Sequence, residues 1–189
     1  SANIQDILIT THYRPQKIQD HFGSGEKFGV DIRYAHETEP RGTAGALKLL
    51  ERPQNPILVI NADIFTDLYF SDMINFHDEQ EAEMTVAVRK YQMHVDYGVI
   101  DTNGIKITGL VEKPTLDFFI NAGIYVLQPS CFDHFPDGNR FDMTDLITNL
   151  VESDRNVISF PIHESWLDIG QHADYEKATR ENGKYGANE

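Results

Sequence analysis

Short apolar runs alternate with amphipathic stretches along most of the chain. The run Ile57–Ile60 has four consecutive apolar residues, which predicts a short strand buried on both faces that ends in Asn61-Ala62-Asp63. Further β-rich or alternating runs predict strands at 7–9, 30–36, 84–88, 118–127 and 157–162. Helical spacing predicts helices at 18–22, from Gly42 onward, and at 69–80, 130–135, 143–152 and 173–180. Strands that alternate with helices predict an α/β fold with a mainly parallel sheet.

One pair of strands breaks this alternation. The runs Tyr97–Asp101 and Ile105–Val111 are joined by Thr102-Asn103-Gly104, and Asn-Gly tolerates the positive φ of a tight turn. The sequence therefore predicts an inserted antiparallel hairpin in a mixed sheet. We expect one domain over residues 4–181, a frayed tail at 182–189, and a turn at Trp166–Gly170.

Composition excludes several classes of partner. Sixteen Lys and Arg against 30 Asp and Glu leave a net charge of −14, so we expect no nucleic-acid or membrane partner, and a phosphorylated substrate would need a cation. Cys131 is the only cysteine, which excludes an internal disulfide and indicates a packing role. No run is long enough to span a bilayer, and Ser1-Ala2-Asn3 does not resemble a signal peptide, so we expect a cytoplasmic protein.

Two acidic residues follow apolar runs. Asp63 comes directly after the predicted buried strand, where a carboxylate commonly caps the next helix or holds Mg²⁺ against a phosphate. Asp168 lies between Leu167 and Ile169, and an acid in such surroundings needs an N–H group, a cation or a metal as its partner. If both acids held one Mg²⁺, both placements would be explained.

Three further segments allow either a structural or a functional interpretation. Gly42-Thr43-Ala44-Gly45 opens a predicted helix, where free N–H donors could approach a ligand or small residues could simply pack. Glu112-Lys113-Pro114 is either a solvated strand end or a phosphate and hydroxyl contact. Asn121 begins an apolar stretch and needs hydrogen bonds from backbone or ligand.

Together these segments resemble the sugar-phosphate nucleotidyltransferases, and the likeness covers nearly the whole chain. It rests on landmarks in the family's order: Pro40 with Gly42–Ala46, Asn61-Ala62-Asp63, Tyr97-Gly98-Val99, Glu112-Lys113-Pro114 with Asn121-Ala122-Gly123, and Trp166–Gly170. The resemblance implies a Rossmann-like fold and Mg²⁺-dependent transfer of a nucleoside monophosphate from an NTP to a sugar 1-phosphate. Within the family, the chain looks most like the guanylyltransferase branch whose members are attached to regulatory domains.

The resemblance also implies roles for individual residues. Asp63 and Asp168 would hold Mg²⁺, and Lys113 would bind the sugar phosphate. The other roles would be nucleotide contacts from Gly42, Thr43, Ala44 and Gly45, and sugar contacts from Gly98, Glu112, Asn121 and Gly123.

One part of the family pattern has no counterpart before Ile7. The family's first strand and its glycine-rich loop with Thr and Arg hold the triphosphate, and the sequence shows neither. We therefore expect a sheet that lacks this strand, and little or no transferase activity from this chain alone. Three explanations stay open: a fragment left after proteolysis, a chain shortened in another way, or two chains that complete each other's sheets and hence form a homo-oligomer. The alternative function is a non-catalytic module that binds a sugar phosphate or a nucleotide.

Overall fold

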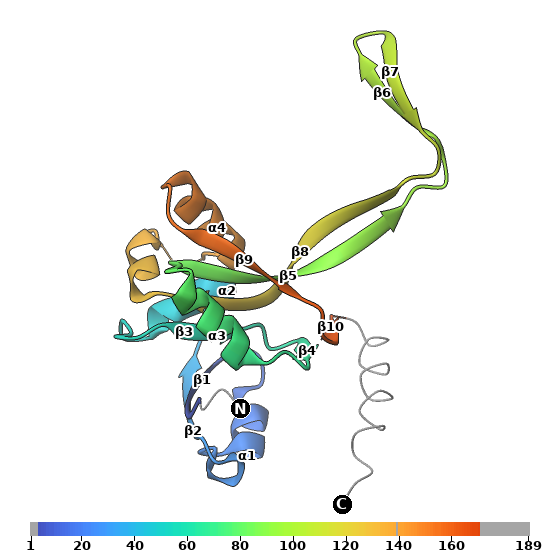
Figure 1. The fold of residues 1–189 in the computed structure, drawn as a ribbon. Helices are drawn as coiled ribbons and strands as arrows, with labels where there is room; N and C mark the ends of the chain where they lie inside the picture. Colours follow the sequence, from blue (N-terminus) through green and yellow to red (C-terminus); the bar gives the residue numbers. More distant parts are fainter. Residues whose placement is uncertain (1–3, 139, 171–189) are drawn as a thin grey trace, which may run out of the picture.

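A four-stranded sheet forms the centre of the computed structural model, which describes residues 4–138 and 140–170 (Figure 1). Its strand order is β3 (Ile57–Ile60), β8 (Thr115–Leu127), β5 (Met84–His94) and β9 (Val157–Ile162). β5 and β9 are parallel, whereas β8 runs antiparallel to both β3 and β5. β3, β5 and β9 therefore point the same way, and the predicted mixed α/β sheet is confirmed.

Helices cover both faces of this sheet. On one face α3 (Phe70–Glu79) packs Met73 against Ala87, Ile124 and Ile162. The other face, which includes Met84, Tyr125 and Leu127, is covered by four short helices: α2 (Gly42–Gly45), η2 (Ala46–Leu49), η3 (Pro129–His134) and α4 (Met143–Glu152). Successive residues of β8 alternate between these two clusters because successive side chains of a strand point to opposite faces.

A second, smaller sheet precedes the central one in the chain. β1 (Asp6–Thr11) and β2 (Asp31–His36) are parallel, and α1 (Pro15–Phe22) and η1 (Glu26–Phe28) connect them. Among the described residues, β1 pairs only with β2, and β3 pairs only with β8. Each strand therefore has one open edge, although its apolar sequence is typical of a central strand. This arrangement agrees with a sheet that lacks one strand.

The two strands β5 and β8 are longer than the sequence predicts. Beyond the sheet they continue as a two-stranded ribbon, which ends in the predicted hairpin of β6 (Val99–Asn103) and β7 (Lys106–Val111). Figure 1 shows this segment projecting far from the rest of the molecule. We call residues 89–120 the arm.

Two very short strands were not predicted. β4 (Ile64–Thr66) and β10 (Trp166–Asp168) form an antiparallel pair, so the expected turn at 166–170 is wrong for its first three residues. The pairing partner is remote in sequence, and a local pattern does not reveal it. The predicted helix at 173–180 and the tail at 182–189 lie outside the described residues.

Two titratable groups are fully buried in the core. The Cys131 thiol donates to the carbonyl oxygen of Glu83 at 3.1 Å, and burial raises the pKa of this thiol to about 12. His77 places its Nδ1 2.8 Å from the hydroxyl of Thr85, and burial lowers the pKa of this imidazole. Both residues pack as structural groups, as the sequence indicates for Cys131. No described helix combines the length and the apolar character of a membrane span.

Candidate active site

The pairing of β4 with β10 brings the backbone segments of the two predicted metal ligands together. Asp168 lies opposite Ile64, and the N–H of Ile169 donates to the carbonyl oxygen of Asp63, which directly precedes β4, at 2.8 Å. Both aspartates are exposed to solvent. Two acidic residues that are remote in sequence are thus neighbours along the backbone of this strand pair.

Two hydrogen bonds between side chain and backbone hold β10 against the central sheet. The indole N–H of Trp166 donates to the carbonyl oxygen of Ala122 in β8 at 2.8 Å. The guanidinium of Arg89 in β5 donates to the carbonyl oxygen of Trp166 at 3.3 Å, and its carbon lies 5.7 Å from the centre of the indole ring. β10, and with it Asp168, is therefore fixed against the sheet by two different strands.

A cavity of about 310 Å³ opens beside this strand pair. Ile64, Ala122 and Trp166 contribute apolar surface to its wall. The polar residues of the wall are Thr43, Asn61, Asn121, Asp142, Thr144 and Asp168. Its mixture of apolar and polar walls is typical of a small-molecule site.

Residues of β8 form one wall of the cavity. Asn121, Ala122, Gly123 and Tyr125 all line it, at the irregularity in the pairing of β8 with β5 where Gly123 has a positive φ. The amide nitrogen of Asn121 donates to the hydroxyl of Tyr125 at 2.9 Å, and its amide oxygen accepts from the N–H of Gly123 at 3.0 Å. Burial raises the pKa of Tyr125, so its hydroxyl stays protonated at neutral pH. These contacts fix the orientation of the Asn121 amide.

The segment Gly42–Gly45 packs against the start of α4 instead of offering free donors. The N–H of Thr43 donates to the Asp142 carboxylate at 3.0 Å. The N–H groups of Ala44 and Gly45 donate to the carbonyl oxygen of Phe141 at 3.0 and 2.7 Å. Of the two interpretations that the sequence left open, the structure shows the packing role for these three N–H groups, which the loop before α4 uses. Thr43 still lines the cavity.

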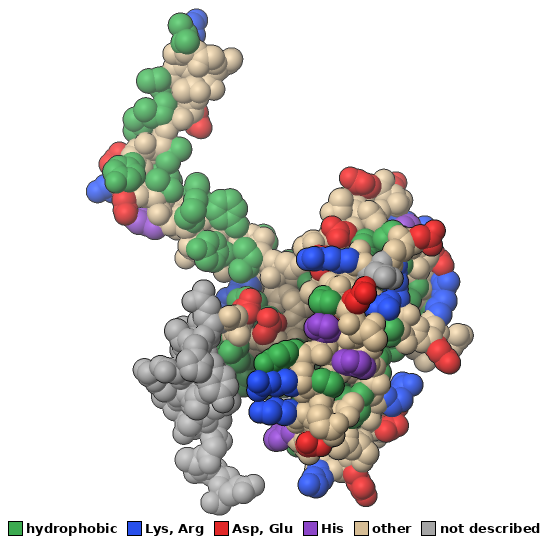
Figure 2. Space-filling view, turned by 180° about the vertical axis from the view of Figure 1, so that it is seen from behind, with side chains coloured by type: hydrophobic (Ala, Val, Ile, Leu, Met, Phe, Trp, Pro, Cys, Tyr) green, Lys and Arg blue, Asp and Glu red, His purple; other side chains and the backbone are tan. Residues whose placement is uncertain are grey.

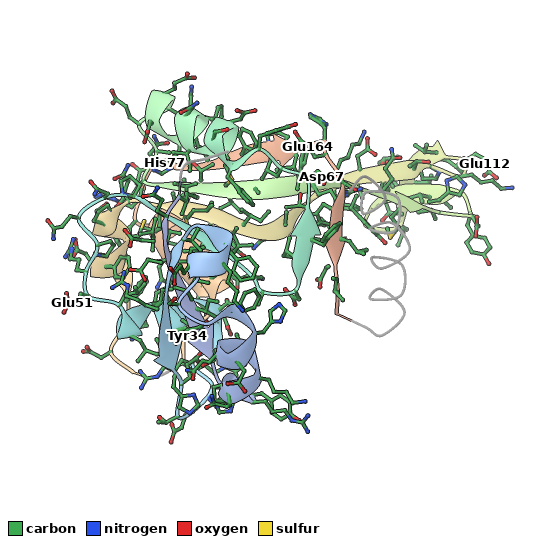
Figure 3. All side chains as sticks on the ribbon, turned by 90° about the horizontal axis from the view of Figure 1, so that it is seen from below. Tyr34, Glu51, Asp67, His77, Glu112 and Glu164 are labelled. Atoms are coloured by element: carbon green, nitrogen blue, oxygen red, sulfur yellow. The ribbon has the colours of Figure 1, made fainter. Side chains whose placement is uncertain are left out.

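The remaining predicted residues gather elsewhere. Gly98, Glu112 and Lys113 meet at the base of the β6–β7 hairpin, where the N–H of Lys113 donates to the carbonyl oxygen of Tyr97 at 3.3 Å. A Cβ atom on Gly98 would lie 2.8 Å from the Glu112 carboxylate. Figure 3 places Glu112 out on the arm, away from Asp67, which directly follows β4. The predicted residues therefore lie in two places. Thr43, Asn121, Gly123 and Asp168 line the cavity, whereas Gly98, Glu112 and Lys113 lie on the arm.

Comparison with known proteins shows to which family this chain is related. The family described as Nucleotidyl transferase matches residues 1–184. The chain belongs to this nucleotidyl transferase family. It is 34% identical to a mannose-1-phosphate guanyltransferase of Yarrowia lipolytica, over 95% of this chain and 52% of that protein. It is 32% identical to the mannose-1-phosphate guanylyltransferase catalytic subunit beta of Dictyostelium discoideum, over 91% of this chain and 50% of the relative.

This nucleotidyl transferase chain spans about half the length of the curated relatives that it matches. Among solved structures, HddC from Yersinia pseudotuberculosis superposes with a TM-score of 0.70 at 23% identity, over 96% of this chain and 80% of that one. The shared fold agrees with the Rossmann-like fold that the sequence predicts.

Some residues that line the cavity were not predicted as site residues from the sequence of this nucleotidyl transferase chain. Tyr125 shares the period-two spacing of Asn121 and Gly123, so the strand pattern could have identified it. Asp142 is the N-cap of α4, and nothing in its local sequence indicates that it also faces the cavity.

Proposed function

We propose that this chain carries the cavity of a Mg²⁺-dependent sugar-1-phosphate nucleotidyltransferase. The reaction would transfer a nucleoside monophosphate from an NTP to a sugar 1-phosphate, and release pyrophosphate. The observation that supports the proposal is that Asp63, directly before β4, is joined through its carbonyl oxygen to the N–H of Ile169, the neighbour of Asp168, and that Asp168 lines the cavity. The names of the relatives make GTP and mannose 1-phosphate the first substrates to test.

The donor set suits Mg²⁺. Mg²⁺ prefers oxygen ligands, and in phosphate sites it commonly takes one or two carboxylates plus the substrate phosphates. Asp63, directly before β4, and Asp168, at the end of β10, supply two exposed carboxylates. A chain with a net charge of −14 also needs a cation to accept a triphosphate. When bound, Mg²⁺ would neutralise charge on the phosphates and help to orient them.

The chemistry would require positioning more than proton transfer. A phosphate oxygen of the sugar 1-phosphate attacks the α-phosphorus, a new oxygen–phosphorus bond forms, and the bond to the β-phosphate breaks as pyrophosphate leaves. The attacking oxygen is already ionised, so no general base is needed. Tyr125 and Gly123 occupy one amide N–H and the amide oxygen of Asn121, which leaves the second N–H for a sugar hydroxyl.

The other roles implied by the family resemblance are part of the same proposal. Lys113 would bind the sugar phosphate, with Gly98 and Glu112 beside it on the arm, so the arm must approach the cavity during the reaction. Gly42–Gly45 would contact the nucleotide, and the Phe141–Asp142 loop would then release the N–H groups of Thr43, Ala44 and Gly45.

Calorimetry with Mg²⁺ and GDP-mannose tests the metal site without requiring turnover. We expect Asp63→Asn and Asp168→Asn each to weaken Mg²⁺-dependent binding at least about tenfold, since each removes one charged ligand. Glu79→Gln, which removes an exposed carboxylate from α3, is the matched control and should leave binding unchanged. Binding that is equal with and without Mg²⁺, or unaffected by either aspartate substitution, would contradict the proposal.

A pyrophosphate-release assay separates the enzyme from a non-catalytic binding module. It compares this chain with a version extended upstream by the family's glycine-rich loop. Turnover by the extended version alone supports the enzyme. Binding by both versions with turnover by neither supports the module.

A further inference from the structure

Arg89 occupies the point where β5 leaves the central sheet, which we call the root of the arm. Its backbone lies between two strands, opposite Ile120 in β8 and opposite Ile162 in β9. Ile162 is the last residue of β9, so among the described residues β5 pairs only with β8 beyond Arg89. Figure 2 shows the outer part of the arm standing away from the rest of the molecule. Arg89 therefore has a rigid backbone position beside the cavity, which the outer residues of the arm lack.

The guanidinium of Arg89 holds the segment that connects β9 to β10. Its Nη1 donates to the carbonyl oxygens of Glu164 at 3.4 Å and of Trp166 at 3.3 Å. These distances are long for hydrogen bonds, but a charged donor strengthens them. The carbonyl oxygen of Ser165, between these two residues, accepts from the N–H of Asp67 at 3.1 Å, and Figure 3 shows Glu164 and Asp67 near one another at the root of the arm. The entry into β10 is thus held from both the β5 side and the β4 side.

The same guanidinium also packs over the indole ring of Trp166. Its central carbon lies 5.7 Å from the centre of the ring, within the range of a cation–π contact. The indole N–H donates to the carbonyl oxygen of Ala122 at 2.8 Å. The ring is therefore held at its edge by β8 and over its face by β5, which fixes its orientation in the cavity wall.

These contacts use the shape of the guanidinium more than its charge. Among the residues that the structure describes, no carboxylate forms an ion pair with Arg89, although the chain has 30 acidic residues. A planar group with several donors can bond to carbonyl oxygens and pack on an aromatic ring at the same time, whereas a lysine ammonium is a point charge on a flexible stem. The environment of Arg89 therefore indicates a geometric role.

We propose that Arg89 is a positioning residue that sets the orientation of β10 and thereby directs Asp168 toward the cavity. Asp168 follows Trp166 by two residues in the same strand, about 7 Å further along it, and side chains at this spacing share one face. Both residues line the cavity. The consequence for Mg²⁺ rests on the proposed function, whereas the orientation of β10 does not.

Charge and position predict opposite effects of Arg89 on Mg²⁺ binding. A guanidinium near a metal site repels the cation, so its removal should tighten binding if charge decides the outcome. If position decides, its removal lets β10 move and weakens binding, because Mg²⁺ requires near-ideal ligand geometry. The direction of the change therefore separates the two roles.

The fluorescence of Trp166 measures the orientation of β10 without any ligand, because this residue is the single tryptophan of the chain. Time-resolved anisotropy of the full chain compares the wild type with Arg89→Met, which loses the guanidinium, and Arg89→Lys, which keeps the charge. We expect Arg89→Met at least to double, roughly, the amplitude of the nanosecond motion of the indole, and Arg89→Lys to give an intermediate value. Lys90→Met is the matched control: Lys90 is the next residue of β5 and points to the other face, so this variant should resemble the wild type.

Calorimetry with Mg²⁺ and GDP-mannose on the same four proteins supplies the second measurement. We expect Arg89→Met to weaken Mg²⁺-dependent binding about tenfold, as loss of a group that orients a metal ligand commonly does, and Arg89→Lys to weaken it less. Binding of GDP-mannose without Mg²⁺ should stay the same in all four proteins. A purely structural role would lower the melting temperature without this difference between the two kinds of binding.

Three outcomes overturn the inference. The first is an unchanged anisotropy of Trp166 in Arg89→Met, whatever happens to Mg²⁺ binding. The second is tighter Mg²⁺-dependent binding in Arg89→Met, which would assign the effect to charge. The third is an equal change in Lys90→Met. If Trp166 becomes mobile in Arg89→Met alone but the wild type binds GDP-mannose equally with and without Mg²⁺, the positioning of β10 by Arg89 is supported and the proposed function is contradicted.

Discussion

At the scale of single residues, Gly123 is the position in the cavity wall least able to accept a side chain. Its φ is +73°, and a Cβ atom there would lie 2.9 Å from the Asn61 amide nitrogen. We expect Gly123→Ala to lower the free energy of unfolding by about 2–4 kcal/mol, because backbone strain and a clash add together. Urea denaturation measures this change.

Gly104 provides the control for that substitution. Its φ is +62°, but nothing lies within 4 Å of the position that a Cβ would occupy. Gly104→Ala therefore carries the backbone strain without the clash and should cost about 1 kcal/mol. Equal losses for both variants would show that the contact with Asn61 does not matter.

The buried His77 makes stability depend on pH. Burial lowers the pKa of its imidazole in the folded protein below the ordinary value of 6.5, so near that pH the unfolded chain binds more protons. The contribution of neutral His77 to the free energy of unfolding is complete above about pH 6.5. It is lost as the pH falls toward the pKa of His77 in the folded protein, at up to about 1.4 kcal/mol per pH unit. Urea denaturation between pH 5 and pH 8 measures the slope.

His77→Gln should reduce that slope, because the group that titrates is removed. His94→Gln is the control, since His94 is exposed on the arm. If the slope survives in His77→Gln and disappears in His94→Gln, the assignment to His77 is wrong.

At the scale of elements, the start of α4 connects helix capping to the cavity. Asp142 caps α4 through a capping box with Asp145, and its carboxylate also accepts from the N–H of Thr43. Asp142→Ala should cost about 1–2 kcal/mol, whereas Asp142→Asn should cost much less because an amide oxygen still accepts both bonds. Thermal unfolding measures the stability of both variants. Equal losses of stability would show that the negative charge of Asp142, and not its hydrogen bonds, stabilises the start of α4.

Most helices and strands could be predicted because their apolar pattern is local. Ile57–Ile60 and Met143–Glu152 each carry the period of their own structure. β4 and β10 could not be predicted, because three residues form a strand only through their pairing with each other. The outer half of β5 was missed for a related reason: its polar face resembles a loop until β8 pairs with it.

At the scale of the whole molecule, the sequence indicated only part of the arrangement around the candidate site. That Asp63 and Asp168 share one Mg²⁺ stays a prediction, although the pairing of β4 with β10 sets Asp168 opposite Ile64, the residue after Asp63. The sequence did not indicate that Gly98, Glu112 and Lys113 lie out on the arm, because the length of β5 and β8 beyond the sheet sets that distance. Spacing along the chain reports strand order but not how far a ribbon extends.

The burial of Cys131 also provides a practical tool for this molecule. The chain has one thiol, which is inaccessible in the folded state and has a pKa of about 12, so a thiol-specific dye can react only after the core around η3 opens. The rate of dye incorporation therefore counts opening events directly, without a substrate. Each variant described above can be ranked by that rate even if it never turns over a nucleotide.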